Sequence, residues 1–412
     1  DQGSVDAGCY GSDVETPSID RLAREGIRFT RFYSGAPVCS PSRASLLTGS
    51  FTPRAGLTSN AGSSRGDRGM PGDRITMAEV FRRAGYRTAH VGKWHLGWTE
   101  ETDPLAQGFD HSFGHMGGCI DNWSHFFYWN GPNRHDLWRD REEVHEGGAY
   151  FPDLMLREAF GVVDASDERP FFMYFACNVP HYPYQGDASW LEHYEGMPAP
   201  RNLYAAFLST IDDRVGRLLD HLDERGRRDD TIIVFQSDHG HSVETRAFGG
   251  GGDAGPYRGH KFTMFEGGIR VPAIISWPGH LPEGAVRDEA AHASDWLPTL
   301  ASLCGIEITH AIDGMDLAPA LREGTPLPRR VLHWQTGEGD RAQWAVMEGM
   351  YKLIGNANHS ADRPNLSDED RVVFLSDLAT DLGETRNHAS AHPEIVERLR
   401  AAREAYLATL RE

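Results

Sequence analysis

The chain has 412 residues, and its 60 Asp and Glu outnumber its 41 Lys and Arg, which gives a formal net charge of −19. This balance argues against nucleic acid as the main partner, because a phosphate backbone requires clustered basic side chains. A site for anions would need a local basic cluster inside a negative surface. The apolar runs, of which Phe171–Cys177 is among the longest, are far shorter than the roughly 18 residues that cross a bilayer, so we expect no membrane span.

Strand and helix signals alternate along the chain as far as about residue 310. Met77–Ala84 has a helical pattern and leads into a predicted strand at Arg87–Val91. The clearest predicted helix, Asn202–Arg225, carries one apolar stripe and ends before Gly226. This alternation favours an α/β fold with a largely parallel sheet. The stripe consists of Leu203, Phe207, Ile211, Val215, Leu218 and Leu222, and further strands are predicted at Pro170–Cys177, Thr231–Gln236 and Arg270–Trp277.

Beyond residue 310 the pattern changes to short strands separated by turn signals. Val331–Trp334, Gln343–Met347 and Tyr351–Ile354 predict a small antiparallel sheet, and Pro393–Leu410 predicts an amphipathic closing helix. We therefore predict two domains, residues 1–325 and 326–412, with the boundary in the Gly- and Pro-containing stretch Arg322–Arg330.

Polar side chains follow three of the predicted strands. Lys93 and His95 come after the first, His181 after the second, and Asp238 and His239 after the third. Ligands of open α/β sheets bind beyond the carboxyl ends of strands, so these side chains are candidates for one common site. A single loop histidine is usually only solvated, but three such strand ends together favour a functional site.

Cys39 begins the run Cys-Ser-Pro-Ser-Arg, in which Pro41 suits the first turn of a helix. Arg43 would then lie one turn along on the same side. The start of a helix favours negative charge, so Cys39 is a candidate thiolate nucleophile or metal ligand. The alternative is a small buried apolar side chain, which is the commonest role of a free cysteine.

The run Cys39–Arg43, followed by Leu46-Leu47-Thr48-Gly49, resembles the signature of the type I, formylglycine-dependent sulfatases. Four other segments resemble further motifs of that family, in the family's order, so the resemblance covers nearly the whole chain. It implies the fold of the alkaline phosphatase superfamily: a large mixed, mostly parallel sheet sandwiched by helices, with a smaller C-terminal α+β domain on a short antiparallel sheet. The four segments are Thr16–Leu22, Gly92–Gly97, Phe265–Pro272 and Ser294–Thr299.

The resemblance also implies roles for individual residues. Cys39 would be oxidised to formylglycine by a formylglycine-generating enzyme, and the hydrate of the aldehyde would be the nucleophile. Arg43 would hold this hydrate, and His95 would take the proton that breaks the covalent intermediate. Lys93, His181 and Lys261 would bind the sulfate or assist the leaving group.

One calcium ion is the metal that the resemblance implies, with magnesium as the alternative. Its ligands would be Asp1, the modified residue at Cys39, Asp238 and His239. Asp1-Gln2-Gly3 matches the second half of an Asp-Asp-x-Gly element. The first Asp of that element and the strand that carries it lie outside this sequence, which leaves metal occupancy open.

The implied function is hydrolysis of a sulfate monoester. Lys and Arg would supply positive charge where the ester oxygens accumulate negative charge. Two alternatives remain: a phosphodiester or phosphonate monoester hydrolase of the same superfamily, and an inactive protein that binds sulfated glycans. Family members are often exported, so the expected location is periplasmic or secreted.

A sulfated saccharide is the expected substrate. Cys119–Trp138 is dense in aromatic side chains, which would either stack on sugar rings or form local core under a long loop. Gly249–Tyr257, which leads into Lys261, is predicted to be a mobile lip on the site.

Overall fold

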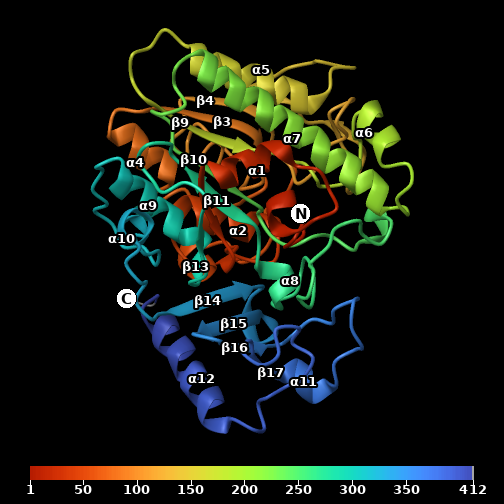
Figure 1. Ribbon diagram of the computed structural model, residues 1–412, viewed down its shortest axis with the longest axis vertical. Coiled ribbons are helices and arrows are strands. Elements are labelled where there is room, and N and C mark those ends of the chain that lie inside the picture. The colour runs from red at the N-terminus through yellow and green to blue at the C-terminus, as the bar shows by residue number, and fades with distance from the viewer. Residues whose placement is uncertain (411–412) are drawn as a thin grey trace.

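A computed structural model describes residues 1–410 of the chain as a large body of two sheets and their helices, with a smaller antiparallel sheet below it (Figure 1). The first sheet has the order β8-β7-β4-β3-β9. Its central strand β3 (Arg87–Lys93) pairs in parallel with both β4 (His111–His115) and β9 (Phe171–Ala176). The predicted strands at Arg87–Val91 and Pro170–Cys177 are confirmed as β3 and β9, respectively.

The second sheet has the order β10-β11-β1-β12. Strand β11 (Ala273–Ser276) runs antiparallel to both β10 (Ile233–Gln236) and β1 (Gly26–Phe29), while β12 (Ala285–Arg287) is parallel to β1. The α/β fold with mixed pairing is therefore confirmed. Parallel pairs surround β3, and antiparallel pairs surround β11.

An apolar cavity of about 710 Å³ separates β9 from β10. Phe172 and Tyr174 line it from one side, and Ile233 and Phe235 from the other. No strand among residues 1–410 lies between these two, so each is the edge of its own sheet and its side chains are only half-buried. The strands thus form two hydrogen-bonded sheets where the sequence predicted one.

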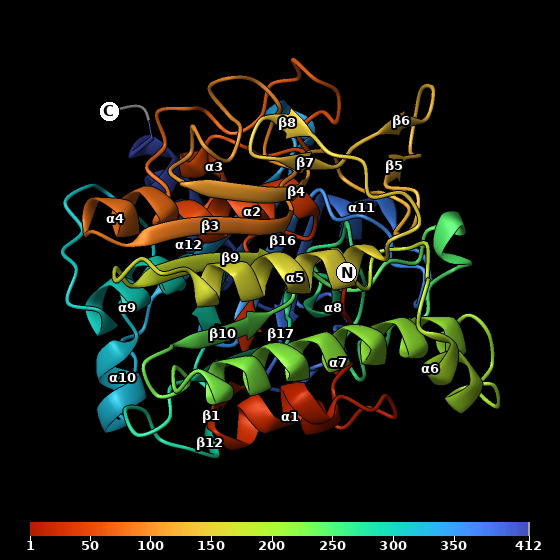
Figure 2. The same ribbon diagram turned by 90° about the horizontal axis from the view of Figure 1, so that it is seen from above.

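Two groups of helices cover these sheets. Helices α1 (Pro17–Arg24), α5 (Phe151–Asp164) and α7 (Arg201–Glu224) lie side by side (Figure 2). Helices α2 (Cys39–Thr48), α4 (Met77–Arg83) and α9 (Trp296–Leu303) form the second group. The predicted helix Asn202–Arg225 is confirmed as α7. Within its stripe Phe207, Ile211 and Leu222 are buried and the remaining three residues half-buried.

The C-terminal sheet is antiparallel, in the order β14-β15-β16-β17. Its first three strands confirm the predicted ones, and α12 (Pro393–Ala408) confirms the closing helix. Strand β17 (Val373–Asp377) escaped the sequence analysis because it is short and follows a helical turn directly. The domain division at residue 325 stays a prediction.

The C-terminal sheet is tied to the body by a buried ionic cluster. The Lys352 ammonium of β16 lies 2.6 Å from Glu266 Oε1 and 3.1 Å from Glu384 Oε1, and all three side chains are fully buried. Glu266 belongs to α8 (Glu266–Ile269) of the body and also pairs with Arg270.

The remaining elements are short and lie mainly in loops. No helix among residues 1–410 is both long and apolar enough to cross a membrane. The bounds of these short elements and of the C-terminal strands are β2 Phe32–Tyr33, β5 Phe126–Phe127, β6 Arg134–His135, β7 Trp138–Arg139, β8 Glu142–Glu143, β13 Ala291–His292, β14 Val331–Thr336, β15 Gln343–Glu348, β16 Tyr351–Gly355, α3 Thr52–Ala55, α6 Ala188–His193, α10 Ala318–Glu323 and α11 Asp368–Val372.

Candidate active site

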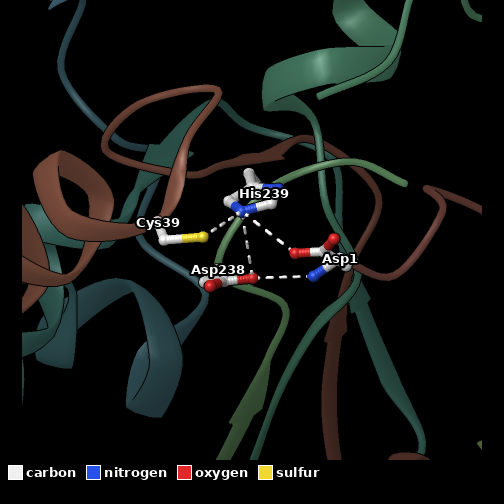
Figure 3. Close-up of side chains that lie close together, drawn as sticks. All are labelled: Asp1, Cys39, Asp238 and His239. Carbon is white, nitrogen blue, oxygen red and sulfur yellow. Dashed lines mark hydrogen bonds and ion pairs between the residues drawn. The ribbon is translucent and has the colours of Figure 1, made fainter. Parts of the chain in front are cut away.

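Segments far apart in the sequence meet at the carboxyl ends of β3, β9 and β10. Cys39 is the first residue of α2, and Asp238 and His239 follow β10 after Ser237. Asp1 lies beside them, so that four potential ligand groups face one another (Figure 3). The structure thus brings together the side chains that the strand-end argument selected.

The four groups form one hydrogen-bonded set. Cys39 Sγ lies 3.3 Å from His239 Nε2, which in turn lies 3.3 Å from Asp1 Oδ1 and 3.6 Å from Asp238 Oδ1. The α-ammonium of Asp1 donates to Asp238 Oδ1 at 2.8 Å. One ligand atom from each residue lies within 4.8 Å of all the others, so small movements would bring them around one ion.

The donor set fits a divalent cation. It offers two carboxylates, Asp1 and Asp238, an imidazole, and the side chain at position 39. Hard cations such as calcium bind carboxylate oxygens. The imidazole of His239 and the side chain at position 39 would supply the other two ligands.

Positive charge surrounds Cys39 from several sides. The chain has three lysines, and two of them, Lys93 and Lys261, are buried in this site. The Lys93 ammonium lies 3.3 Å from Cys39 Sγ. Burial alone would raise the pKa of the Cys39 thiol, but the charges of Lys93 and Lys261 outweigh it and hold the pKa well below its ordinary value. The site therefore stabilises an anion at this position.

Arg43 lies one helical turn after Cys39, as predicted. Its guanidinium donates to Asp238 Oδ2 at 3.0 Å and to the Lys93 carbonyl oxygen at 3.0 Å, and is thereby fixed behind the site. Burial would raise the pKa of Asp238, but His239, the Asp1 ammonium and Arg43 hold it well below the usual range. Asp238 is thus an anion at any pH near neutrality.

Two further buried histidines, His181 and His95, line the site. The Nδ1–H of His181 donates to the Tyr182 carbonyl oxygen at 2.7 Å, which leaves Nε2 as the free ring nitrogen. Burial, reinforced by Lys261 and Lys93, lowers the pKa of His181 well below 6.5, and burial also lowers the pKa of His95. Both rings are neutral at pH 7 and can accept a proton.

Sequence reasoning missed Glu244. Its Oε2 accepts hydrogen bonds from Tyr182 at 3.0 Å and Ser242 at 2.9 Å, and lies 3.4 Å from the Lys261 ammonium. The ammonium of Lys261 also donates to Asp1 Oδ2 at 3.0 Å. Glu244 lies in the loop that follows β10, and that position was the only signal available for it. The residues that the sequence predicted for the site all lie in it. The roles assigned to these residues stay predictions.

The chain is similar to known proteins over most of its length. The family model described as Sulfatase matches residues 1–306, and one described as N-sulphoglucosamine sulphohydrolase, C-terminal, matches residues 255–397. N-acetylgalactosamine-6-sulfatase of Sus scrofa is 34% identical over 85% of this chain and 69% of its own length. Arylsulfatase A of Homo sapiens is 34% identical over 97% of this chain and 84% of its own length.

The solved structure of Ps i-CgsB in complex with k-i-k-neocarrahexaose superposes with a TM-score of 0.85 at 26% identity. The match covers 98% of this chain and 90% of that chain.

Proposed function

The chain belongs to the sulfatase family and is a sulfuric ester hydrolase, and from this premise we propose that its substrate is a sulfated saccharide. The observation that carries the proposal is the buried cation cluster around Cys39 in a chain of net charge −19. Such a local reversal of charge suits a small dianionic or monoanionic group and not a long polyanion lying across the surface. The names of two similar proteins, an N-acetylgalactosamine-6-sulfatase and a complex with a neocarrahexaose, support a sugar as the carrier of the sulfate.

We assign the nucleophile to position 39. The family implies a formylglycine there, and its hydrate would provide two hydroxyl groups on one carbon. One hydroxyl attacks sulfur, and loss of the other's proton expels sulfate and restores the aldehyde. We assign this proton to the ring of His95, which is neutral because burial lowers its pKa.

The remaining cations bind the ester. Lys93 and Lys261 would contact the sulfate oxygens and stabilise the negative charge that builds up on these oxygens. His181 presents an unprotonated Nε2, which can accept a hydrogen bond from the substrate, so we assign protonation of the departing alcohol to the Lys261 ammonium. Arg43, held by Asp238, orients the hydrate.

Calcium is the ion that we propose for the four-ligand set, with magnesium as the alternative. When bound, the ion would acidify a hydroxyl group and neutralise charge on the sulfate. We expect added CaCl₂ to raise the midpoint of thermal unfolding, because an ion that binds only the folded chain stabilises it. Asp238→Asn should abolish this rise and lower sulfatase activity.

Asp220→Asn is a suitable control, since Asp220 is an exposed carboxylate that pairs with Arg21 on the helical face. The shift should persist unchanged in this variant. An equal calcium-dependent rise in Asp238→Asn would contradict the assignment. Parallel titrations with MgCl₂ would decide between the two ions.

Maturation and location follow as further parts of the proposal. A formylglycine-generating enzyme would have to act on Cys39 before the site closes, because this residue is 2% exposed in the folded chain. Mass analysis of the peptide that contains Cys39 would distinguish the thiol from the aldehyde. We propose a periplasmic or secreted location, where calcium is available, and fractionation of the producing cells would test it.

The proposed function is tested by comparing esters of one alcohol. The wild-type chain should turn over 4-nitrophenyl sulfate and sulfated sugars much faster than the phosphodiester or phosphonate monoester of the same alcohol. The reverse order would favour the alternative hydrolase. Binding of sulfated glycans with no turnover, in protein whose residue 39 is shown to be formylglycine, would favour the inactive binding protein.

A further inference from the structure

The aromatic segment Cys119–Trp138 has two different sides in the structure. Phe127 is 2% exposed and packs under the guanidinium of Arg134, so it belongs to local core. Trp123, Phe126 and Trp129 are 47%, 39% and 38% exposed, respectively. The interpretation as local core is therefore correct for Phe127, and the exposed residues need an explanation of their own.

Trp129 is paired with an arginine from a distant loop. The guanidinium carbon of Arg246 lies 4.6 Å from the centre of the indole ring, and its Nη2 donates to the Trp129 carbonyl oxygen at 2.9 Å. Within residues 1–410 these are the contacts of the Arg246 guanidinium, and neither is a carboxylate. A guanidinium has five N–H donors, so most of those of Arg246 remain available.

Among residues 1–410, no Asp or Glu side chain pairs with Arg246. Most ion pairs of this acidic chain join arginines to Asp or Glu, as in the pairing of Arg21 with Asp223. Arg246 instead combines free N–H donors with a flat apolar ring beneath it. That combination suits a ligand with both a sugar ring and an anionic substituent.

The Trp129–Arg246 pair adjoins the catalytic cluster through one residue. The ring of Tyr182 lies 6.2 Å from the Trp129 ring and 4.4 Å from the His181 ring. The Tyr182 hydroxyl donates to Glu244, two positions before Arg246, and Glu244 lies 3.4 Å from the Lys261 ammonium. The pair therefore lies at the edge of the sulfate-binding cations.

Phe248 extends the exposed surface on the same loop. It is 67% exposed, and its φ of 56° lies in the left-handed region, which costs energy for a residue with a Cβ. Backbone hydrogen bonds from Ala247 and Gly249 to the Glu244 carbonyl oxygen hold this turn. A large apolar side chain is thus kept in solvent two residues after Arg246 at the expense of backbone strain.

We propose that Trp129, Arg246 and Phe248 form a second saccharide subsite, which binds the sugar next to the sulfated one in an anionic oligosaccharide. The neighbouring sugar packs on the exposed indole and phenyl rings, and Arg246 binds its sulfate or carboxylate group. This inference rests on the proposed function and narrows it. The preferred substrate is an oligosaccharide with at least two anionic groups, and a sulfated monosaccharide is a poorer one.

The test compares substrates of different length. The probes are 4-nitrophenyl sulfate, N-acetylgalactosamine 6-sulfate, chondroitin 6-sulfate tetrasaccharide and neocarrahexaose sulfates. The wild type should have a higher kcat/KM on at least one oligosaccharide than on the monosaccharide. Trp129→Ala and Arg246→Ala should each lower that kcat/KM at least about fivefold, mainly through KM, and leave 4-nitrophenyl sulfate turnover unchanged within about twofold. Arg246→Ala should also weaken the salt dependence, because one exposed cationic contact is removed.

Trp123→Ala and Arg217→Ala are the matched controls. Trp123 is a more exposed tryptophan of the same segment, and Arg217 is an exposed arginine on α7. Both variants should match the wild type on all probes, and thermal unfolding should verify that every variant is folded.

Three results would overturn the inference: equal kcat/KM for monosaccharide and oligosaccharides, equal losses on long and short substrates, or turnover of 4-nitrophenyl sulfate without turnover of any oligosaccharide. A wild-type chain with formylglycine at position 39 that hydrolyses no sulfate ester at all would count against the proposed function instead. If the variants lost binding to another protein but kept oligosaccharide kinetics, the surface would be a protein-binding site and the inference would be wrong.

Discussion

Cys39→Ser should reduce steady-state turnover of 4-nitrophenyl sulfate by at least about three orders of magnitude, while a single equivalent of 4-nitrophenol is still released. The serine hydroxyl would occupy the position of the thiol, 3.3 Å from the Lys93 ammonium. It can displace the alcohol once and become a sulfate ester. It has no second hydroxyl on the same carbon, so the sulfate cannot be expelled by forming an aldehyde.

The measurement is a stoichiometric burst of product, followed by intact-mass detection of one added sulfo group on the variant. Cys39→Ala should give neither the burst nor the adduct. Cys9→Ser provides a matched substitution, since Cys9 is half-buried beside α1 and contributes nothing to the site. Sustained turnover by Cys39→Ser near the wild-type rate would show that the nucleophile lies elsewhere.

Lys352→Met should lower the free energy of unfolding by about 3–5 kcal/mol, because it leaves two buried carboxylates without their common cation. Glu266 would retain Arg270 at 3.2 Å, whereas Glu384 would keep only hydrogen bonds from Ser376 and the Glu266 backbone. Denaturant unfolding followed by circular dichroism would measure the loss. A change below about 1 kcal/mol would mean that the cluster contributes little net stability.

The loss should also depend on pH. Burial already raises the pKa of Glu384 above its ordinary value, and removal of the Lys352 charge raises it further. A carboxyl group with a higher pKa in the folded state binds more protons there than in the unfolded state, so folding is favoured as pH falls. The variant should therefore be less impaired at pH 5 than at pH 8.

Two further variants serve as controls for Lys352→Met. Addition of Glu384→Gln should recover part of the stability, because it removes one of the two unpaired charges. Arg398→Met removes a cation from an exposed pair with Glu348 and should cost less than about 1 kcal/mol.

Most residues of the candidate site could be predicted from the sequence because they lie at the ends of strands. Strands β3, β9 and β10 are short, largely apolar runs, and the polar residues at or after their carboxyl ends, such as Lys93 and His181, are brought together by the sheet edges. Cys39 and Arg43 share a helix, so their spacing fixed their relation. Glu244 had no such signal, since its position depends on how a long loop folds back onto Tyr182.

The other features that the sequence did not predict depend on tertiary structure. Phe127 and Trp129 belong to one aromatic run, yet only the packing of that loop decides that the first is core and the second is exposed. Separation of the strands into two sheets was equally hidden, because hydrophobic runs predict strands but do not specify hydrogen-bonded neighbours. Lys352 pairs with Glu266 and Glu384, which lie far from it in the chain, and no local sequence pattern predicts this pairing.

The carboxylate of Asp1 has a consequence for how the two parts of the site act together. Its Oδ1 lies 3.3 Å from His239 Nε2, and its Oδ2 accepts a hydrogen bond from Lys261 at 3.0 Å. A cation bound at Oδ1 would weaken the attraction between Oδ2 and the Lys261 ammonium, which would then be freer to bind an anionic ester. Binding of the ion and binding of the ester would therefore be coupled, each favouring the other by the same factor.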